Sequence, residues 1–206
     1  MTVDEIFTRF PRLETPRLVL RQIAARDAAA IFATFADPET MAFYGEEPHR
    51  TIEDAREHIR ELDGWYARHE GIRWGITRRD DATDEVIGSC GLFKFDEDAH
   101  RAEVGYELRR AFWRQGIMRE ALGALLAFAF DALELHRVEA VVDDGNAASQ
   151  GLLGALGFAH EGALRQRFFF RGRYWDEHYY GLLRDDWQRD HPTGQADDVV
   201  RRPPGA

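Results

Sequence analysis

Hydrophobic and polar residues alternate along several short segments, and this pattern predicts β-strands. Within residues 14–23, Leu18 and Leu20 alternate with Arg17 and Arg21, which is the period-two spacing of a strand with one buried face. The same alternation, or a short apolar run bounded by polar turn residues, predicts six further strands. These strands are expected at residues 71–78, 86–95, 102–108, 136–142, 161–171 and 175–183.

Other segments carry apolar residues at helical spacing. Thr51 followed by Asp54 resembles a capping box, and Ile52, Ala55 and Ile59 continue one face of the helix that it opens. Helices are expected at residues 27–35, 51–69, 117–133 and 146–156. The third is apolar nearly all round, so we expect it to be buried against a sheet.

The order of these elements predicts one α/β domain without repeats or an internal linker. We expect an N-terminal arm over residues 1–13, the domain over residues 14–187, and a tail over residues 188–206. The tail contains three of the seven prolines and few apolar residues, a composition typical of disorder.

Composition narrows the classes of function. With 44% apolar residues the 206-residue chain can build a core, and its net charge of −10 disfavours nucleic-acid binding and leans towards amine-bearing partners. No segment is long and apolar enough to cross a membrane, and the N-terminus lacks the apolar core of a signal peptide, so a cytoplasmic protein is expected. The single cysteine, Cys90, excludes an internal disulfide and a cysteine-cluster metal site. No metal is expected.

The most informative stretch is the strand 102–108 followed by Arg114-Gln115-Gly116-Ile117-Met118-Arg119 at the start of the long helix. A tight glycine turn at a helix N-terminus points backbone N–H groups outward, which suits a pyrophosphate. Arg114 and Arg119 would add positive charge. On spacing alone the alternative stays open that Gly116 only makes the turn and that the arginines are solvated.

At this stretch the sequence resembles a known family. Residues 104–108 and 112–122 look like the acetyl-coenzyme A loop of the GNAT superfamily of N-acetyltransferases, and the nearest branch is the RimJ/RimL type, which acetylates N-terminal amines of ribosomal proteins. Trp113 and Met118 depart from the usual loop pattern. Three more stretches match in order: Thr15-Pro16-Arg17-Leu18-Val19-Leu20-Arg21, Asn146 to Gly162, and the strand with Asp176 and Tyr180 that precedes Trp187.

The resemblance implies a GNAT-like α/β (α+β) fold. Its central sheet is mixed and mostly antiparallel, with about seven strands splayed in the middle and about four flanking helices. It also implies that acetyl-CoA binds between strands 102–108 and 136–142, and that the acetyl group moves directly to a primary amine in a ternary complex. Expected cofactor contacts are Leu108, Arg109, Arg110, Arg114, Gln115, Gly116, Ile117, Met118, Arg119, Asn146 and Ser149.

The reaction needs an acid for the leaving thiolate and a base for the amine. The resemblance gives Ser149 as the acid, with Asn146 on the pantetheine arm; alternatively Asn146 only caps a short helix. For the base we favour Glu103 over Asp96, Glu97 and Glu107. Glu103 could instead be a solvated or ion-paired carboxylate, and a water chain could replace a direct base.

Two further questions stay open at this point. A non-catalytic acyl-CoA-binding or regulatory module is the alternative to an enzyme, because Met118 is bulky and residues 150–158 contain no tyrosine. The acceptor is a protein N-terminus, a polyamine, an amino sugar or another amine. Aromatic residues in the late strands make a homodimer plausible.

Overall fold

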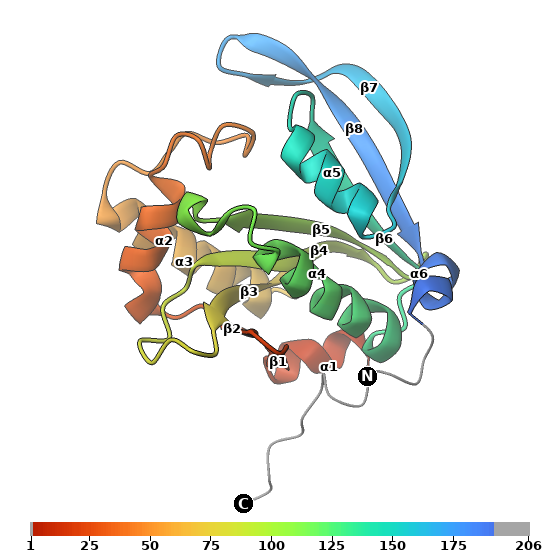
Figure 1. Ribbon diagram of the computed structural model, residues 1–206, viewed down its shortest axis with the longest axis horizontal. Helices are drawn as coiled ribbons and strands as arrows, with labels where there is room; N and C mark the ends of the chain where they lie inside the picture. The colour runs from red at the N-terminus through yellow and green to blue at the C-terminus, as the bar shows by residue number, and fades with distance from the viewer. Residues whose placement is uncertain (1, 192–206) are drawn as a thin grey trace, which may run out of the picture.

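The chain folds around one eight-stranded sheet in the order β1-β2-β3-β4-β5-β6-β8-β7 (Figure 1). The structure is a computed structural model, and it describes residues 2–191. The strands are β1 (Leu13–Glu14), β2 (Leu18–Gln22), β3 (Gly71–Arg78), β4 (Gly88–Asp96), β5 (Arg101–Leu108), β6 (Arg137–Asp143), β7 (Ala159–Phe170) and β8 (Arg173–Leu183). Neighbouring strands are antiparallel except for β5 and β6.

The sheet splits between β5 and β6. These two strands pair over only three positions, Arg101–Glu103 opposite Arg137–Glu139. Beyond them β5 keeps its pairing with β4 as far as Leu108, and β6 keeps its pairing with β8 as far as Asp143. The halves β1–β5 and β6–β8 therefore diverge, as the predicted splayed sheet requires.

Helices cover both faces of the sheet (Figure 1). Within residues 2–191 they are α1 (Val3–Thr8), α2 (Ala28–Phe35), α3 (Ile52–Ala67), α4 (Ile117–Ala127), α5 (Ala147–Ala155) and α6 (Arg184–Asp190). The long apolar helix α4, extended by a π-helical turn over Phe128–Ala132, packs on the face that carries Trp74, Cys90 and Leu92. Its apolar surface is buried in the largest core cluster, as the sequence predicts.

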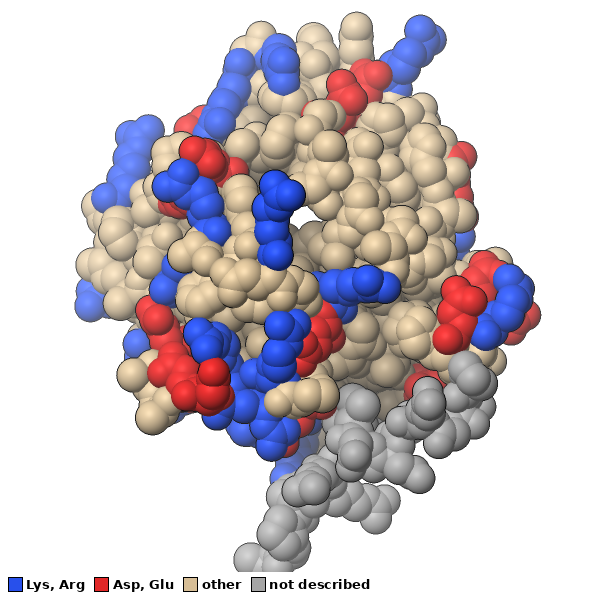
Figure 2. Space-filling model, in the orientation of Figure 1, with Lys and Arg blue, Asp and Glu red and all other residues tan. Residues whose placement is uncertain are grey.

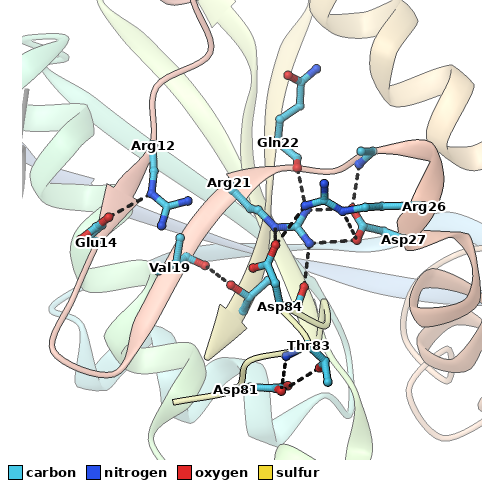
Figure 3. Close-up of polar contacts among 12 residues, drawn as sticks. Arg12, Glu14, Val19, Arg21, Gln22, Arg26, Asp27, Asp81, Thr83 and Asp84 are labelled. Carbon is cyan, nitrogen blue, oxygen red and sulfur yellow. Dashed lines mark hydrogen bonds and ion pairs between the residues drawn. The ribbon is translucent and has the colours of Figure 1, made fainter. Parts of the chain in front are cut away.

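A buried ion pair holds together elements in the N-terminal half of the chain. The Arg21 guanidinium on β2 donates to both carboxylate oxygens of Asp27 at 2.8 and 2.9 Å and to the backbone carbonyl of Asp84 at 2.8 Å (Figure 3). The side chains of Arg21 and Asp27 are 9% and 6% exposed. This contact ties the start of α2 and the turn before β4 to the same strand.

The predicted elements of the domain are confirmed, with three additions. The segment 14–23 is divided into β1 and β2 by a turn in which the amide of Leu18 donates to the Thr15 hydroxyl. The predicted arm contains α1, which buries Ile6 and Phe7, and α6 runs past residue 187 to Asp190. Residues 192–206, the rest of the predicted tail, lie outside the described residues. No helix within residues 2–191 has the length and apolar character to span a bilayer.

Candidate active site

A cavity of about 1190 Å³ lies where β5 and β6 diverge. Both halves of the sheet contribute to its wall, together with the turn before α4 and the N-terminal half of α5. Of the residues predicted for the site, the cavity is lined by Glu103, Leu108, Arg114, Gly116, Ile117, Met118, Arg119, Asn146 and Ser149. Predicted site residues up to 46 positions apart in sequence, Glu103 and Ser149, therefore line the same cavity.

The turn before α4 has the geometry of an anion-binding site. Gly116, the N-cap residue of α4, has φ +74°, and Arg114 has φ +59°. No side chain caps this helix in the described chain, so the N–H groups of its first turn and the positive end of its dipole remain available to a ligand. Arg114 and Arg119 line the cavity beside them. Figure 2 shows basic side chains around an opening near the centre of this face.

A bracket of three residues, Thr15, Arg17 and Glu120, holds this turn against the sheet. The Glu120 carboxylate accepts from the Thr15 hydroxyl at 2.6 Å, from the Arg17 amide at 3.0 Å and from Arg17 Nε at 2.5 Å. Arg17 Nη1 in turn donates to the carbonyl of Gln115 at 3.1 Å. These contacts fix the peptide that precedes Gly116.

Three predicted cofactor residues, Arg109, Arg110 and Gln115, are not among the residues that line the cavity. Arg109 pairs with Glu85 at 2.9 Å and donates to the carbonyl of Val86. Arg110 pairs with Asp37 and with Glu39, which does line the cavity. The Gln115 amide donates to the carbonyl of Ala111 at 2.9 Å. The cofactor contacts of these three residues stay predictions.

Ser149 and Asn146 are placed together at the start of α5. The Asn146 side chain accepts from the amide of Ser149 at 3.1 Å, so Asn146 does cap this helix. Ser149 Oγ lies 2.6 Å from the phenolic oxygen of Tyr106 on β5. Burial raises the pKa of Tyr106 to about 12, although the hydrogen bond to Ser149 acts in the opposite direction.

No sequence pattern points to Tyr106 as a residue of the site. Its contact with Ser149 bridges 43 positions, and no local pattern encodes such a contact. The Ser149 hydroxyl at the start of α5 is therefore paired with a phenol from β5.

Glu103 lines the cavity in an ion pair. Its Oε2 lies 2.9 Å from Lys94 Nζ, and its side chain is 16% exposed. Glu103 is therefore ion-paired, which was one of the alternatives for it, and its carboxylate also lines the cavity.

A second carboxylate, Glu107, is buried in the same wall. It pairs with Arg73 on β3 and accepts a hydrogen bond from the Ser89 hydroxyl, and Arg73 Nε also donates to Ser89 at 2.6 Å. Burial raises the pKa of Glu107, while Arg73 and Ser89 act against that rise. Glu103 and Glu107 lie on the same side of β5 because side chains alternate along a strand, but the partner of Glu107, Arg73, is 34 positions away in sequence and no local pattern points to it.

The two residues that depart from the family pattern, Trp113 and Met118, both have defined contacts in the structure. Trp113 lines the cavity, and its indole Nε1 donates to the carbonyl of Leu108 at 2.6 Å, which closes the segment between β5 and the turn. Met118 is 7% exposed and belongs to the core cluster under α4. Its bulk is therefore accommodated mainly by packing.

Comparison with known proteins identifies this architecture. Residues 17–159 match the family model described as an acetyltransferase (GNAT) domain. The chain is 42% identical over 175 residues to the uncharacterized N-acetyltransferase YoaA of Bacillus subtilis, a match covering 85% of this chain and 98% of that protein.

Solved structures give the same result. A putative ribosomal-protein-serine acetyltransferase from Vibrio cholerae is 27% identical with a TM-score of 0.73, and the match covers 89% of this chain and 99% of that one. The fold is also shared by a spermidine N-acetyltransferase from Vibrio cholerae in complex with CoA and spermine, at 23% identity and a TM-score of 0.72, over 84% of this chain and 99% of that one. The chain therefore belongs to the GNAT family and is an acetyltransferase.

Proposed function

We propose that this enzyme transfers an acetyl group from acetyl-CoA directly to a primary amine, either a protein N-terminus or a small-molecule amine, in a ternary complex. One observation carries the proposal. The cavity between the diverging strands has an anion-binding turn at Gly116 and also a hydroxyl pair, Tyr106 and Ser149, and a carboxylate, Glu103. These groups match the parts of a bimolecular acyl transfer.

The cavity fits the chemistry of acetyl-CoA. The turn at Gly116 and the side chains of Arg114 and Arg119 provide N–H groups and positive charge for a pyrophosphate. Beyond Glu103 the ladder between β5 and β6 stops, so the β5 backbone from Val104 to Leu108 has an edge free for the amides of a pantetheine arm.

Acetyl-CoA supplies an acetyl group activated as a thioester. The amine nitrogen attacks the carbonyl carbon, a C–N bond forms and the C–S bond breaks, so the ammonium must lose a proton and the thiolate must gain one. Ser149 is our choice for the donor of the second proton. With Tyr106 donating to Ser149 Oγ, the hydroxyl hydrogen of Ser149 is free to turn into the cavity, and a phenol is a stronger acid than an alcohol.

Glu103 is our choice for the base. Its carboxylate lines the cavity beside Lys94, so it can accept a proton directly or through one water. Glu107 is less suited to the role because Arg73 and Ser89 already occupy its oxygens.

Two experiments test the proposal. Calorimetry should show that the protein binds acetyl-CoA, and that Gly116→Trp abolishes binding because φ +74° disfavours a side chain that would also fill the turn. Thiol release from acetyl-CoA across an amine panel should then fall in Glu103→Gln and Ser149→Ala while cofactor affinity is retained. A protein that does not bind acetyl-CoA contradicts the proposal, and binding without turnover of any amine supports the non-catalytic alternative.

A further inference from the structure

A buried arginine of β3 reaches across the sheet to the wall of the cavity. Arg73 lies opposite Gly91 on β4, and Gly91 lies opposite Gly105 on β5, so the three residues form one row across neighbouring strands. A Cβ atom at Gly91 would be 3.1 Å from Arg73 Cβ, and one at Gly105 would be 3.7 Å from Arg73 Nη1. Because neither neighbour has a side chain, the arginine lies across β4 and its guanidinium ends beside Gly105.

Two of the three guanidinium nitrogens are held by the protein. Arg73 Nε donates to the Ser89 hydroxyl at 2.6 Å, and Nη2 pairs with the Glu107 carboxylate, which also accepts from Ser89. All three side chains are buried, and those of Arg73 and Glu107 are 9% and 3% exposed. Nη1 takes no part in these contacts. The guanidinium is therefore fixed with one nitrogen on the side of Gly105, and Arg73 and Gly105 both line the cavity.

The Arg73 guanidinium stays charged in this position. Burial acts to lower its pKa, but the negative charge of Glu107 outweighs burial, so the pKa of Arg73 lies above its ordinary value. Little water screens a charge at such a site. A buried cation whose N–H groups border a cavity therefore acts strongly on negative charge that develops there.

Gly105 lies between the groups that we assign to proton transfer. Glu103 precedes it by two positions on the same side of β5, and Tyr106, which contacts Ser149, follows it directly. During the reaction the carbonyl carbon bonds to the sulfur that Ser149 protonates and to the nitrogen whose proton Glu103 takes. We therefore expect this carbon over Gly105, where Arg73 Nη1 ends.

We propose that the Arg73 guanidinium stabilises the negative charge that forms on the carbonyl oxygen of the thioester during acetyl transfer. This inference rests on the proposed function. When the amine nitrogen bonds to the carbonyl carbon, the electron pair of the C=O π bond moves to the oxygen. The pair re-forms the C=O bond as the C–S bond breaks and the thiolate leaves with its electrons. Arg73 donates a hydrogen bond to the oxyanion and keeps its own proton throughout.

Glu107 and Ser89 are positioning residues in this arrangement. They hold Nη2 and Nε, so that Nη1 is the nitrogen that reaches the carbonyl oxygen. A donor that is fixed before the reaction needs no reorganisation when the charge appears. Lysine at position 73 would keep the charge, but its single nitrogen cannot hold Glu107 and also reach over Gly105.

The kinetic test removes the ion pair as a unit. Arg73→Gln with Glu107→Gln takes away both charges, so neither is left buried and unpaired, whereas Glu107→Gln alone keeps the guanidinium. With the best acceptor of the amine panel, kcat and kcat/KM of the double variant should fall together by about 100-fold or more, the size of the loss of one oxyanion donor. Glu107→Gln should retain most of the activity, and Arg73→Lys should lie between the two.

The matched control is Arg21→Gln with Asp27→Asn. It removes a buried pair of the same kind, and its residues are not among those that line the cavity. The control should lower stability and leave kcat unchanged, and acetyl-CoA affinity should stay constant in every variant. A double variant as active as Glu107→Gln, or an equal loss of kcat in the control, overturns the proposal. If the double variant does not fold, Arg73→Lys, which keeps the charge beside Glu107, gives the same comparison.

A spectroscopic measurement tests the contact without an acceptor. The infrared band of bound acetyl-CoA, labelled with 13C at the thioester carbonyl, reports how strongly that carbonyl is polarised. The band should lie at lower frequency in the wild type and in Glu107→Gln than in the double variant, because the guanidinium draws electron density towards the oxygen. Binding with the same band position in all variants overturns this inference, whereas a wild type that does not bind acetyl-CoA contradicts the proposed function itself.

Discussion

At the scale of single residues, the pair Tyr106 and Ser149 gives the clearest prediction. Tyr106→Phe removes only the phenolic oxygen that lies 2.6 Å from Ser149 Oγ. If the phenol supports proton donation, kcat should fall by about 100-fold, the lower end of the range of general acid catalysis, with acetyl-CoA affinity unchanged. Steady-state kinetics and calorimetry measure the two quantities. An unchanged kcat would limit Tyr106 to packing.

The buried pair Arg21 and Asp27 gives a prediction about stability. Asp27→Asn removes the buried one of the two carboxylates that pair with the Arg21 guanidinium and leaves only the partly exposed Asp84, so the free energy of unfolding should fall by about 2 kcal/mol. Asp80→Asn is the matched control, because the Asp80–Arg78 pair is exposed and should change stability little. Urea unfolding of both variants measures the two changes in the free energy of unfolding, and equal changes would contradict the prediction.

His58 on α3 should make the protein less stable in acid. Its Nε2 is buried and has no hydrogen-bond partner among the described residues. The centroid of its ring lies 4.4 Å from the centroid of the Phe35 ring. Burial, with a smaller contribution from the positive charge of Arg73, lowers the pKa of His58 to about 3. Below the ordinary pKa of about 6.5 the unfolded state binds a proton that the folded state refuses, so stability decreases by up to about 1.4 kcal/mol per pH unit.

The measurement is the free energy of unfolding between pH 7 and pH 4. His58→Gln should show a shallower loss than the wild type, whereas His136→Gln, at an exposed position, should not. Equal slopes in the wild type and His58→Gln would show that this imidazole does not drive the acid dependence.

Residues of the site were predictable where a local pattern carries them. Gly116 lies in a short strand-to-helix turn that the sequence shows directly, whereas Asn146 and Ser149 were expected from the family resemblance, because their spacing alone predicts only a helix cap. Tyr106 acts through a contact across the cavity, and the partners of Glu107 come from two other strands. Alternation gives the side of a strand but not the residues that face it from elsewhere.

At the scale of elements, the bracket around Glu120 should control how well the anion-binding turn is formed. Glu120→Gln keeps the shape but removes the charge that holds Arg17, whose Nη1 fixes the carbonyl of Gln115. The Kd for acetyl-CoA should rise by about three- to tenfold, as expected for a lost charge-assisted contact, with kcat at saturation retained. Glu134→Gln, beyond the end of α4, is the control. A fall in kcat without a change in Kd would contradict this role.

Helices and strands were predicted well where the sequence carries a capping residue at the start or several apolar residues at regular spacing. The capping box at Thr51 and Asp54 is present at the start of α3, and β3 has the predicted bounds. Helix α1 has the same signal, a capping box between Thr2 and Glu5, but its six residues are too few for a periodic pattern. It is stabilised by packing, with the Tyr66 hydroxyl donating to the carbonyl of Ile6 at 2.7 Å.

At the scale of the whole molecule, charge is divided unevenly around the cavity. Arg114 and Arg119 line one part of it, while Glu39, Glu103, Glu107, Asp143 and Glu177 line other parts. In a chain of net charge −10, this arrangement should attract a protonated amine over long range. The KM of a cationic acceptor should therefore rise with salt between about 20 and 300 mM. A KM that is independent of salt would contradict electrostatic attraction.

The homodimer suggested by the aromatic late strands stays a prediction. Phe169 and Tyr174 near the hairpin tip are 58% and 63% exposed, and their rings contact each other. Sedimentation of the wild type beside Phe169→Ser with Tyr174→Ser tests whether this pair contributes to self-association.

The last strand in the sheet, β7, bears on how the protein behaves when concentrated. It pairs on one side only, with β8, and so carries the longer of the sheet's two open edges, the other being the two-residue strand β1. Its register is broken twice, between His160 and Gly162 and between Leu164 and Phe168, and Gln166 in the second break has φ +53°. A flat, regular edge is a template for fibrous growth, and such irregularities interrupt it. Strand β7 therefore offers neighbouring molecules no continuous surface for strand addition, although it is twelve residues long.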